Sequence, residues 1–265
     1  MTPVIEQIVH KENGLSYPSG LAYDQEDHVL YIVDMRGKRV RQLDLDRKSL
    51  WTIRDERGVI AFPLAITLYK EGLLVTDTKK KAILQYTKLG WRQFEIDTGN
   101  ERPLQFPGSI AADESGNVYV ADFTTDRICR IDGNTRKLTV LRDIRCHQPY
   151  GIFVRHQTLY VTDTGNKRIL QYDLRMRTLF PYCEGISSIA VAVHPNGRIY
   201  VSENRKLYQF DPRSKSLSLL LDASTWKQFS YPKLCHIGSL CIQNEADLIF
   251  TDTIKNTVYR LSLQQ

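Results

Sequence analysis

Cysteine and histidine recur just before three successive repeats in the second half of this chain. The residues are Cys146, His147, Cys183, Cys235 and His236. Thiolate and imidazole hold zinc tetrahedrally, and both groups also serve in nucleophilic and acid–base catalysis. A zinc site needs its ligands within a few ångströms of one another, whereas the first and last of these pairs precede repeats that are not adjacent. We therefore predict no metal and no cofactor, and take these five residues as the candidates if a metal did bind.

Basic residues occupy a second set of positions, in short hairpins that follow the acidic ends of strands. With the aromatic residues Phe123 and Tyr150 they form the predicted ligand-binding set, whose basic members are Arg36, Lys38, Lys79, Lys80, Lys81, Arg127, Lys167, Arg168, Arg205, Lys206 and Lys255. Asp126 is the single acid in these hairpins apart from the strand ends. Cations that neutralise phosphates, beside rings that stack on bases at about 1–3 kcal/mol per base, are typical of a surface for single-stranded or looped RNA.

Each part of this set has a structural alternative. Arg127 and Arg168, like Arg39, stand five residues after an acid and can pair with it inside the fold. The aromatic residues beside the proline turns can pack between repeats instead of binding a ligand. The lysine run 79–81 can be a solvated turn.

Six short apolar strands must position these residues, and each strand ends on an acid. The acids are Asp34, Asp77, Asp122, Asp163, Glu203 and Asp252. Successive acids are 43, 45, 41, 40 and 49 residues apart, which is the period of a four-stranded propeller blade. We predict an all-β fold, a six-bladed β-propeller of four-stranded antiparallel blades, formed as a single domain by residues 1–265. The basic hairpins and the loops that lead into each blade then emerge on one face, called the top.

The sixth repeat stops after its third strand, and the chain begins with a β-rich segment at residues 4–9. We predict that this N-terminal strand closes the ring as the outer strand of the last blade, because closure removes an open sheet edge. Deletion of residues 1–10 should therefore strongly destabilise the protein.

Blades three and four resemble NHL repeats. The resemblance rests on Asn-Val-Tyr-Val-Ala-Asp at 117–122 followed by Arg127, and on Tyr-Val-Thr-Asp-Thr-Gly-Asn-Lys-Arg-Ile-Leu at 160–170. It extends over all six blades and is poorest in blade five, which lacks the proline turn and carries Glu203. NHL propellers include RNA-binding and protein-binding domains of tripartite-motif ubiquitin ligases, extracellular modules and an amidating lyase. The resemblance therefore implies a fold and not one activity.

Composition bears on the class of protein and on its location. Of its 265 residues 42% are hydrophobic and 25% charged, the net charge is +6, and no apolar run approaches the roughly 20 residues that span a bilayer. The N-terminus lacks the features of a signal peptide, and the five cysteines do not suggest a disulfide framework. We predict a cytoplasmic protein with no membrane contact, monomeric as an isolated domain.

Enzymatic function is the remaining alternative. Six-bladed propellers that act as calcium-dependent lactonases use carboxylates and amides in the central channel. The first strands of this chain place no acid in that channel, whereas a hard cation is coordinated by six or more oxygens. No histidine–acid–nucleophile grouping stands out, and His147 and His236 mark where one would be sought. We predict a non-catalytic module that binds RNA on its top face. A protein-interaction platform, recruiting substrates within a larger assembly, is the alternative, and a metal-dependent lyase or lactonase comes third.

Overall fold

Four of the innermost strands begin with a proline that pairs with the acid ending the next strand. The pairs are Pro18–Asp34, Pro63–Asp77, Pro107–Asp122 and Pro149–Asp163. The strand register shifts directly after each proline. Because proline has no N–H to donate, this irregular start places it where the ladder does not need a donor.

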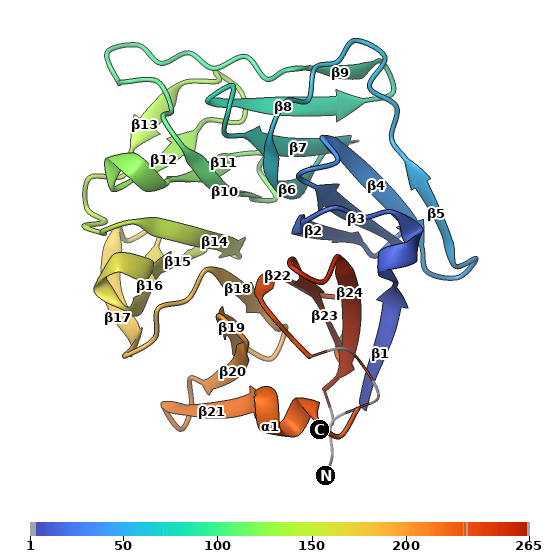
Figure 1. Ribbon diagram of the computed structural model, residues 1–265. Helices are drawn as coiled ribbons and strands as arrows, with labels where there is room; N and C mark the ends of the chain where they lie inside the picture. Colours follow the sequence, from blue (N-terminus) through green and yellow to red (C-terminus); the bar gives the residue numbers. More distant parts are fainter. Residues whose placement is uncertain (1–3, 71, 230, 232, 264–265) are drawn as a thin grey trace. The chain divides into compact units, whose positions relative to one another are not determined.

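The computed structural model describes residues 4–70, 72–229, 231 and 233–263. Within this described part the strands form six sheets, each of four antiparallel strands (Figure 1). The chain divides into two compact units, Arg54–Ser188 and Met1–Ile53 with Ile189–Gln265. Each unit contributes three blades.

Blades two, three and four make up the unit Arg54–Ser188. Blade two consists of β6 (Pro63–Tyr69), β7 (Gly72–Asp77), β8 (Ala82–Thr87) and β9 (Gly90–Gln93). Blade three consists of β10 (Pro107–Ala112), β11 (Val118–Asp122), β12 (Arg127–Ile131) and β13 (Leu138–Val140). Blade four consists of β14 (Pro149–Arg155), β15 (Thr158–Asp163), β16 (Arg168–Asp173) and β17 (Thr178–Glu184).

Blades one, five and six make up the other unit. Blade one consists of β2 (Pro18–Asp24), β3 (Val29–Asp34), β4 (Arg39–Asp44) and β5 (Ser49–Thr52). Blade five consists of β18 (Ala190–Val193), β19 (Ile199–Glu203), β20 (Lys206–Asp211) and β21 (Ser216–Leu221). Blade six consists of β22 (Ile237–Ile242), β23 (Asp247–Asp252), β24 (Thr257–Ser262) and β1 (Val4–Val9).

Helical structure is confined to single turns. These are η1 (Lys11–Asn13), η2 (Phe123–Thr125), η3 (Thr164–Asn166) and α1 (Ala223–Trp226). The turns η2 and η3 form the top hairpins of blades three and four, and each leads directly into the third strand of its blade. Among the described residues no helix is long and apolar enough to cross a membrane.

The core lies between neighbouring blades. Ala111, Tyr119 and Ile128 of blade three pack with Ile152 and Val161 of blade four in one buried cluster. The two innermost strands, β10 and β14, accordingly lie beside each other (Figure 1). Apolar side chains on both faces of each blade thus hold the top hairpins of blades three and four in fixed positions within this unit.

These observations confirm the predicted fold class, including the N-terminal closure of the last blade. Strand β1 pairs antiparallel with β24, with Ile5 opposite Leu261 and Val9 opposite Val258. Ile5 and Val9 are both buried. The N-terminal strand therefore completes a sheet that would otherwise end on an open edge.

Candidate active site

The acids that end the second strands are structural. Asp34, Asp77, Asp122, Asp163 and Asp252 are fully buried. Each accepts backbone N–H groups from the loop that leads into its own blade; the distance from the Asp163 Oδ1 atom to the His147 nitrogen, for example, is 2.7 Å. Because these carboxylates already tie the lead-in loop to the top hairpin, they are not available to act on a substrate.

Three arginines pair with these buried acids, as the structural alternative predicts. The shortest nitrogen-to-oxygen distances are 2.8 Å for Arg39–Asp34, 2.8 Å for Arg127–Asp122 and 2.7 Å for Arg168–Asp163. Each guanidinium also donates to a backbone carbonyl of the lead-in loop, at Gly14, Pro103 and Arg145 respectively. Arg127 and Arg168, two members of the predicted ligand-binding set, therefore brace the loops.

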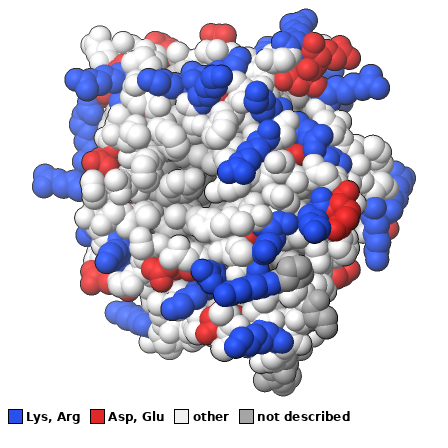
Figure 2. All heavy atoms as spheres, viewed as in Figure 1, with Lys and Arg blue, Asp and Glu red and all other residues white. Residues whose placement is uncertain are grey.

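The other basic members of that set lie at the surface. Arg36, Lys38, Lys79, Lys80, Lys81, Lys167, Arg205 and Lys206 are exposed, and Lys255 is half-buried. Two of them contact neighbouring side chains: the Arg36 guanidinium lies over the Tyr17 ring, and Lys81 donates to the side chain of Gln105. On the face drawn in Figure 2, lysine and arginine side chains are interspersed with aspartate and glutamate.

The predicted aromatic residues pack against each other. The Phe123 ring lies between Phe106 and Tyr150, with both centroid distances 5.7 Å. Tyr150 follows its proline, whereas Tyr17, Phe62 and Phe106 precede theirs. This row joins the blade-three hairpin to the first strand of blade four, as expected of packing between blades.

An exposed histidine–carboxylate pair lies next to that row. The distance between His147 Nδ1 and Asp126 Oδ2 is 3.2 Å, and the two side chains are 54% and 46% exposed. Two other histidine–carboxylate pairs, His28–Asp46 and His156–Glu114, are 3.7 and 3.6 Å apart and thus beyond hydrogen-bond distance. A carboxylate can only accept, so Nδ1 carries the proton and Nε2 is left as a solvent-facing base.

The backbone holds both partners of this pair. Asp126 follows η2 in the left-handed conformation, with φ of 53°, which turns its side chain toward the next blade. Its second oxygen, Oδ1, accepts from the Gln148 nitrogen at 2.7 Å. One carboxylate thus binds the His147 ring and the adjacent backbone together, while Asp163 holds the His147 nitrogen from the other side.

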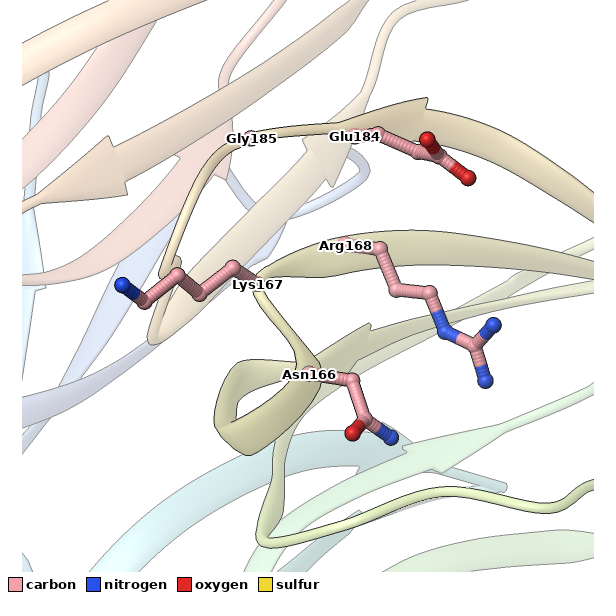
Figure 3. Close-up of a pocket in the computed structure, with 5 residues that line it drawn as sticks. All are labelled: Asn166, Lys167, Arg168, Glu184 and Gly185. Carbon is pink, nitrogen blue, oxygen red and sulfur yellow. The ribbon is translucent and has the colours of Figure 1, made fainter.

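A pocket of about 530 Å³ opens beside the turn that contacts His147. It is lined by Asn166, Lys167, Arg168, Glu184 and Gly185 (Figure 3). In this view the Asn166, Arg168 and Glu184 side chains extend to one side and Lys167 to the other. Asn166 and Arg168 both donate to Asp163, so two pocket residues and the His147 backbone share one buried carboxylate.

The cysteines near this site are poor nucleophiles. Burial raises the pKa of Cys146 to about 12, and it also raises the pKa of Cys183. Burial lowers the pKa of His236, and within the described residues no carboxylate comes within ion-pair distance of its ring. His147, which has a carboxylate partner, is therefore the better candidate for acid–base chemistry of the two histidines noted in the sequence.

The described residues do not fit a resident metal. They contain no grouping of three or more histidine, cysteine, aspartate or glutamate side chains placed to hold an ion. The donors expected of a hard-cation site are carboxylates and other oxygens, and the buried carboxylates that end the second strands already accept backbone N–H groups.

Comparison with known proteins adds the family. The profile of the SMP-30/Gluconolactonase/LRE-like region matches residues 17–182. This chain belongs to that family. No curated protein matches the chain.

Solved structures share the fold of this SMP-30/gluconolactonase/LRE-like chain at low sequence identity. The gluconolactonase XC5397 from Xanthomonas campestris is 15% identical with a TM-score of 0.80, covering 99% of this chain and 90% of its own. A protein described as a candidate gluconolactonase is 16% identical with a TM-score of 0.75, covering 98% and 92%. Virginiamycin B lyase from Staphylococcus aureus is 12% identical with a TM-score of 0.70, covering 99% and 100%.

This family assignment corrects the functional prediction. The prediction of a non-catalytic module for RNA or for a protein partner is wrong in view of the family match, and so is the expectation that the chain is more likely not an enzyme. The error has a physical source. The basic top hairpins suggested an anion-binding surface, but two of their arginines neutralise buried acids of the fold itself.

Sequence reasoning noticed His147 but did not connect it with Asp126. Asp126 stood out as the single acid among basic hairpins, and its partner lies 21 residues further along the chain in the next blade. Asn166 and Glu184 were not singled out. The sequence does contain a signal for this pair. Aligning the repeats on their acids places Asp126 at the last position of one hairpin and His147 in the neighbouring loop.

Proposed function

We propose that this chain opens a small lactone by hydrolysis, with His147 as the general base. The observation that carries the proposal is the exposed His147–Asp126 pair, with 3.2 Å between Nδ1 and Oδ2. The family membership and the lactonase neighbours support this reaction class. An imidazole whose Nδ1–H is held by a carboxylate presents Nε2 to accept a proton.

The reaction follows from this geometry. His147 Nε2 accepts a proton from a water molecule as the water oxygen bonds to the lactone carbonyl carbon. The carbonyl electron pair moves onto its oxygen and returns as the ring C–O bond breaks. The imidazolium, stabilised by Asp126, then gives its proton to the departing ring oxygen, and the product is a hydroxy acid.

Water is the nucleophile in this scheme. Cys146 is adjacent to His147, but partial burial removes water from its thiol and raises its pKa to about 12, and its sulfur donates to the Asp126 backbone oxygen. A thiol with this pKa is almost entirely protonated near neutral pH and attacks carbonyl groups poorly.

The neighbouring pocket offers room for the substrate. Its volume of about 530 Å³ suits a small molecule. Lys167 is exposed at its wall, and its positive charge favours the oxyanion that develops on the carbonyl and the carboxylate of the product.

Lactone hydrolysis by purified protein tests this proposal. A panel of small lactones with plain, polyol and acyl-substituted rings would be followed by proton release in a pH-stat, with product masses measured in parallel. We expect a product heavier than the substrate by the mass of water. We expect His147→Gln to lower kcat by about 10²–10⁴-fold, the usual contribution of a general base.

The matched control is His156→Gln. His156 is also an exposed histidine beside an acid in the same unit, but its Nδ1 lies 3.6 Å from Glu114. It should keep wild-type activity. Equal activity of the wild type and His147→Gln, or no ring opened by the wild type, would overturn the proposal, and a product isomeric with its substrate would replace hydrolysis with elimination.

Other predictions stay open beside this one. The finer resemblance of the top hairpins to NHL repeats is compatible with a hydrolase, since one propeller fold carries different activities. A monomeric state and a cytoplasmic location also remain predictions. Size-exclusion chromatography with light scattering would test the first.

A further inference from the structure

The turn η3 contacts the proposed base through its glycine. A Cβ atom added at Gly165 would lie 2.4 Å from His147 Cδ2 and 2.7 Å from the His147 carbonyl oxygen. The Gly165 nitrogen donates to that same carbonyl at 2.9 Å. The imidazole therefore has Asp126 at its Nδ1 edge and Gly165 at its Cδ2 edge, which leaves the end of the ring with Nε2 open.

The hairpin itself does not require glycine at this position. The five regular top hairpins share one conformation, with a left-handed residue four positions after the acid: Lys38, Lys81, Asp126, Lys167 and Asn256. Gly165 is two positions after the acid, where the other four hairpins carry Arg36, Lys79, Thr124 and Ile254. Its own φ lies outside the left-handed region that favours glycine. The backbone conformation at Gly165 would allow a side chain, so the reason for glycine is the space that His147 occupies.

Blade one shows what a side chain does at this position. Arg36 makes the backbone bond equivalent to that of Gly165, because its nitrogen donates to Ser16 as Gly165 donates to His147. The Arg36 side chain then covers Tyr17 in the lead-in loop. In blade four the His147 ring occupies the space into which a side chain at position 165 would extend, and glycine leaves the ring uncovered.

We propose that Gly165 is a positioning residue that keeps the His147 ring against Asp126 with its Nε2 edge accessible. The inference rests on the proposed function for its catalytic readout only. Its structural readout, the state of the His147 ring, does not depend on any substrate.

Gly165→Ala tests the proposal. A methyl group at 2.4 Å forces the ring to move, so the Nδ1–Asp126 hydrogen bond weakens and Nδ1 shares its proton with Nε2. In nitrogen NMR of ¹⁵N-histidine-labelled protein we expect the His147 pair of ring shifts to change toward a mixture of tautomers. We expect kcat/KM for the best lactone to fall on the order of 100-fold, the scale of a misplaced catalytic group, with a changed pH profile.

Gly108→Ala is the matched control. It adds a methyl in blade three that would lie 3.6 Å or more from its neighbours, which is ordinary contact. It should leave the His147 ring shifts and the activity unchanged. Unaltered His147 shifts in Gly165→Ala would overturn the proposal.

A double variant keeps the test decisive if Gly165→Ala unfolds easily. We expect the loss of thermal stability caused by Gly165→Ala to shrink when His147 is already alanine, since the ring it strikes is gone. Equal losses in both backgrounds would assign the glycine to the backbone contact alone. If the wild type opens no lactone but the ring shifts respond as expected, the proposed function fails and the positioning role stands.

Discussion

Replacing Asp163 by asparagine should destabilise the protein more than the same change at Asp77. Both carboxylates are fully buried and both accept from the loop that leads into their blade. They differ in their side-chain partners. Asp163 also accepts from Asn166 and from the Arg168 guanidinium, the latter at 2.7 Å, whereas the residue of blade two that corresponds to Arg168 is Ala82.

The magnitude follows from the groups that lose a partner. In Asp163→Asn one carboxylate oxygen becomes an NH₂ group, so either the His147 N–H or the Arg168 Nε–H faces a donor. Breaking a buried pair costs about 3–5 kcal/mol, and the Arg168 side chain is 31% exposed, which places the expected loss near the lower bound, about 3 kcal/mol. Asp77→Asn loses a hydrogen bond between a charged acceptor and the Lys80 nitrogen, worth about 1.5 kcal/mol.

Urea unfolding followed by tryptophan fluorescence measures both losses. Arg168→Met and the double variant Asp163→Asn/Arg168→Met complete a cycle, and we expect a coupling of at least about 1 kcal/mol between the two residues. The reasoning is refuted if Asp163→Asn costs no more than Asp77→Asn, or if the cycle shows no coupling. Either result would mean that hydrogen bonds from backbone N–H groups are enough to stabilise the buried carboxylate without Arg168.

Three further predictions concern other parts of the molecule. Deletion of residues 1–10 should lower the free energy of unfolding by about 3–6 kcal/mol, because the apolar side chains of Ile5 and Val9 are buried and each contributes about 1.5–3 kcal/mol; an unchanged melting temperature would contradict the closure of blade six by β1. Cys146 should react with iodoacetamide at pH 8 far more slowly than a model thiol, since a pKa of about 12 leaves roughly 10³-fold less thiolate, and peptide mapping by mass spectrometry would show this. Asp222 caps α1 through hydrogen bonds from Ser224 and Thr225 that lower its pKa to about 2. It therefore stabilises the fold above the ordinary aspartate pKa near 4, and this contribution is lost as the pH falls toward 2. The urea midpoint of Asp222→Ala should fall less steeply than that of the wild type between these pH values, and equal slopes for the two proteins would refute the prediction.

Some of the site could be predicted because equivalent positions in the repeats have equivalent neighbours. Each acid is followed at the same distance by its hairpin, so the pairing of Arg39, Arg127 and Arg168 with these acids could be inferred from a spacing of five residues. A short strand–turn–strand unit determines such neighbours locally, whatever the rest of the chain does.

The His147–Asp126 pair could not be inferred in this way. Its members come from different blades, and their contact depends on the left-handed turn at Asp126 and on how β10 and β14 pack. The same holds for Gly165, whose sequence neighbours resemble any NHL-like hairpin and whose reason for being glycine is a ring 18 positions earlier in the chain.

The amino-acid sequence by itself determined the blades, their number, the closure by the N-terminal strand and the pairing of acids with arginines. These are local or periodic properties, set by the alternation of apolar residues and by fixed spacings. Tertiary structure alone decided which exposed side chains meet between neighbouring top loops, because that depends on the packing of one sheet against the next. The candidate chemistry of this protein lies in such a meeting, between a single acid in one hairpin and a histidine in the loop beside it.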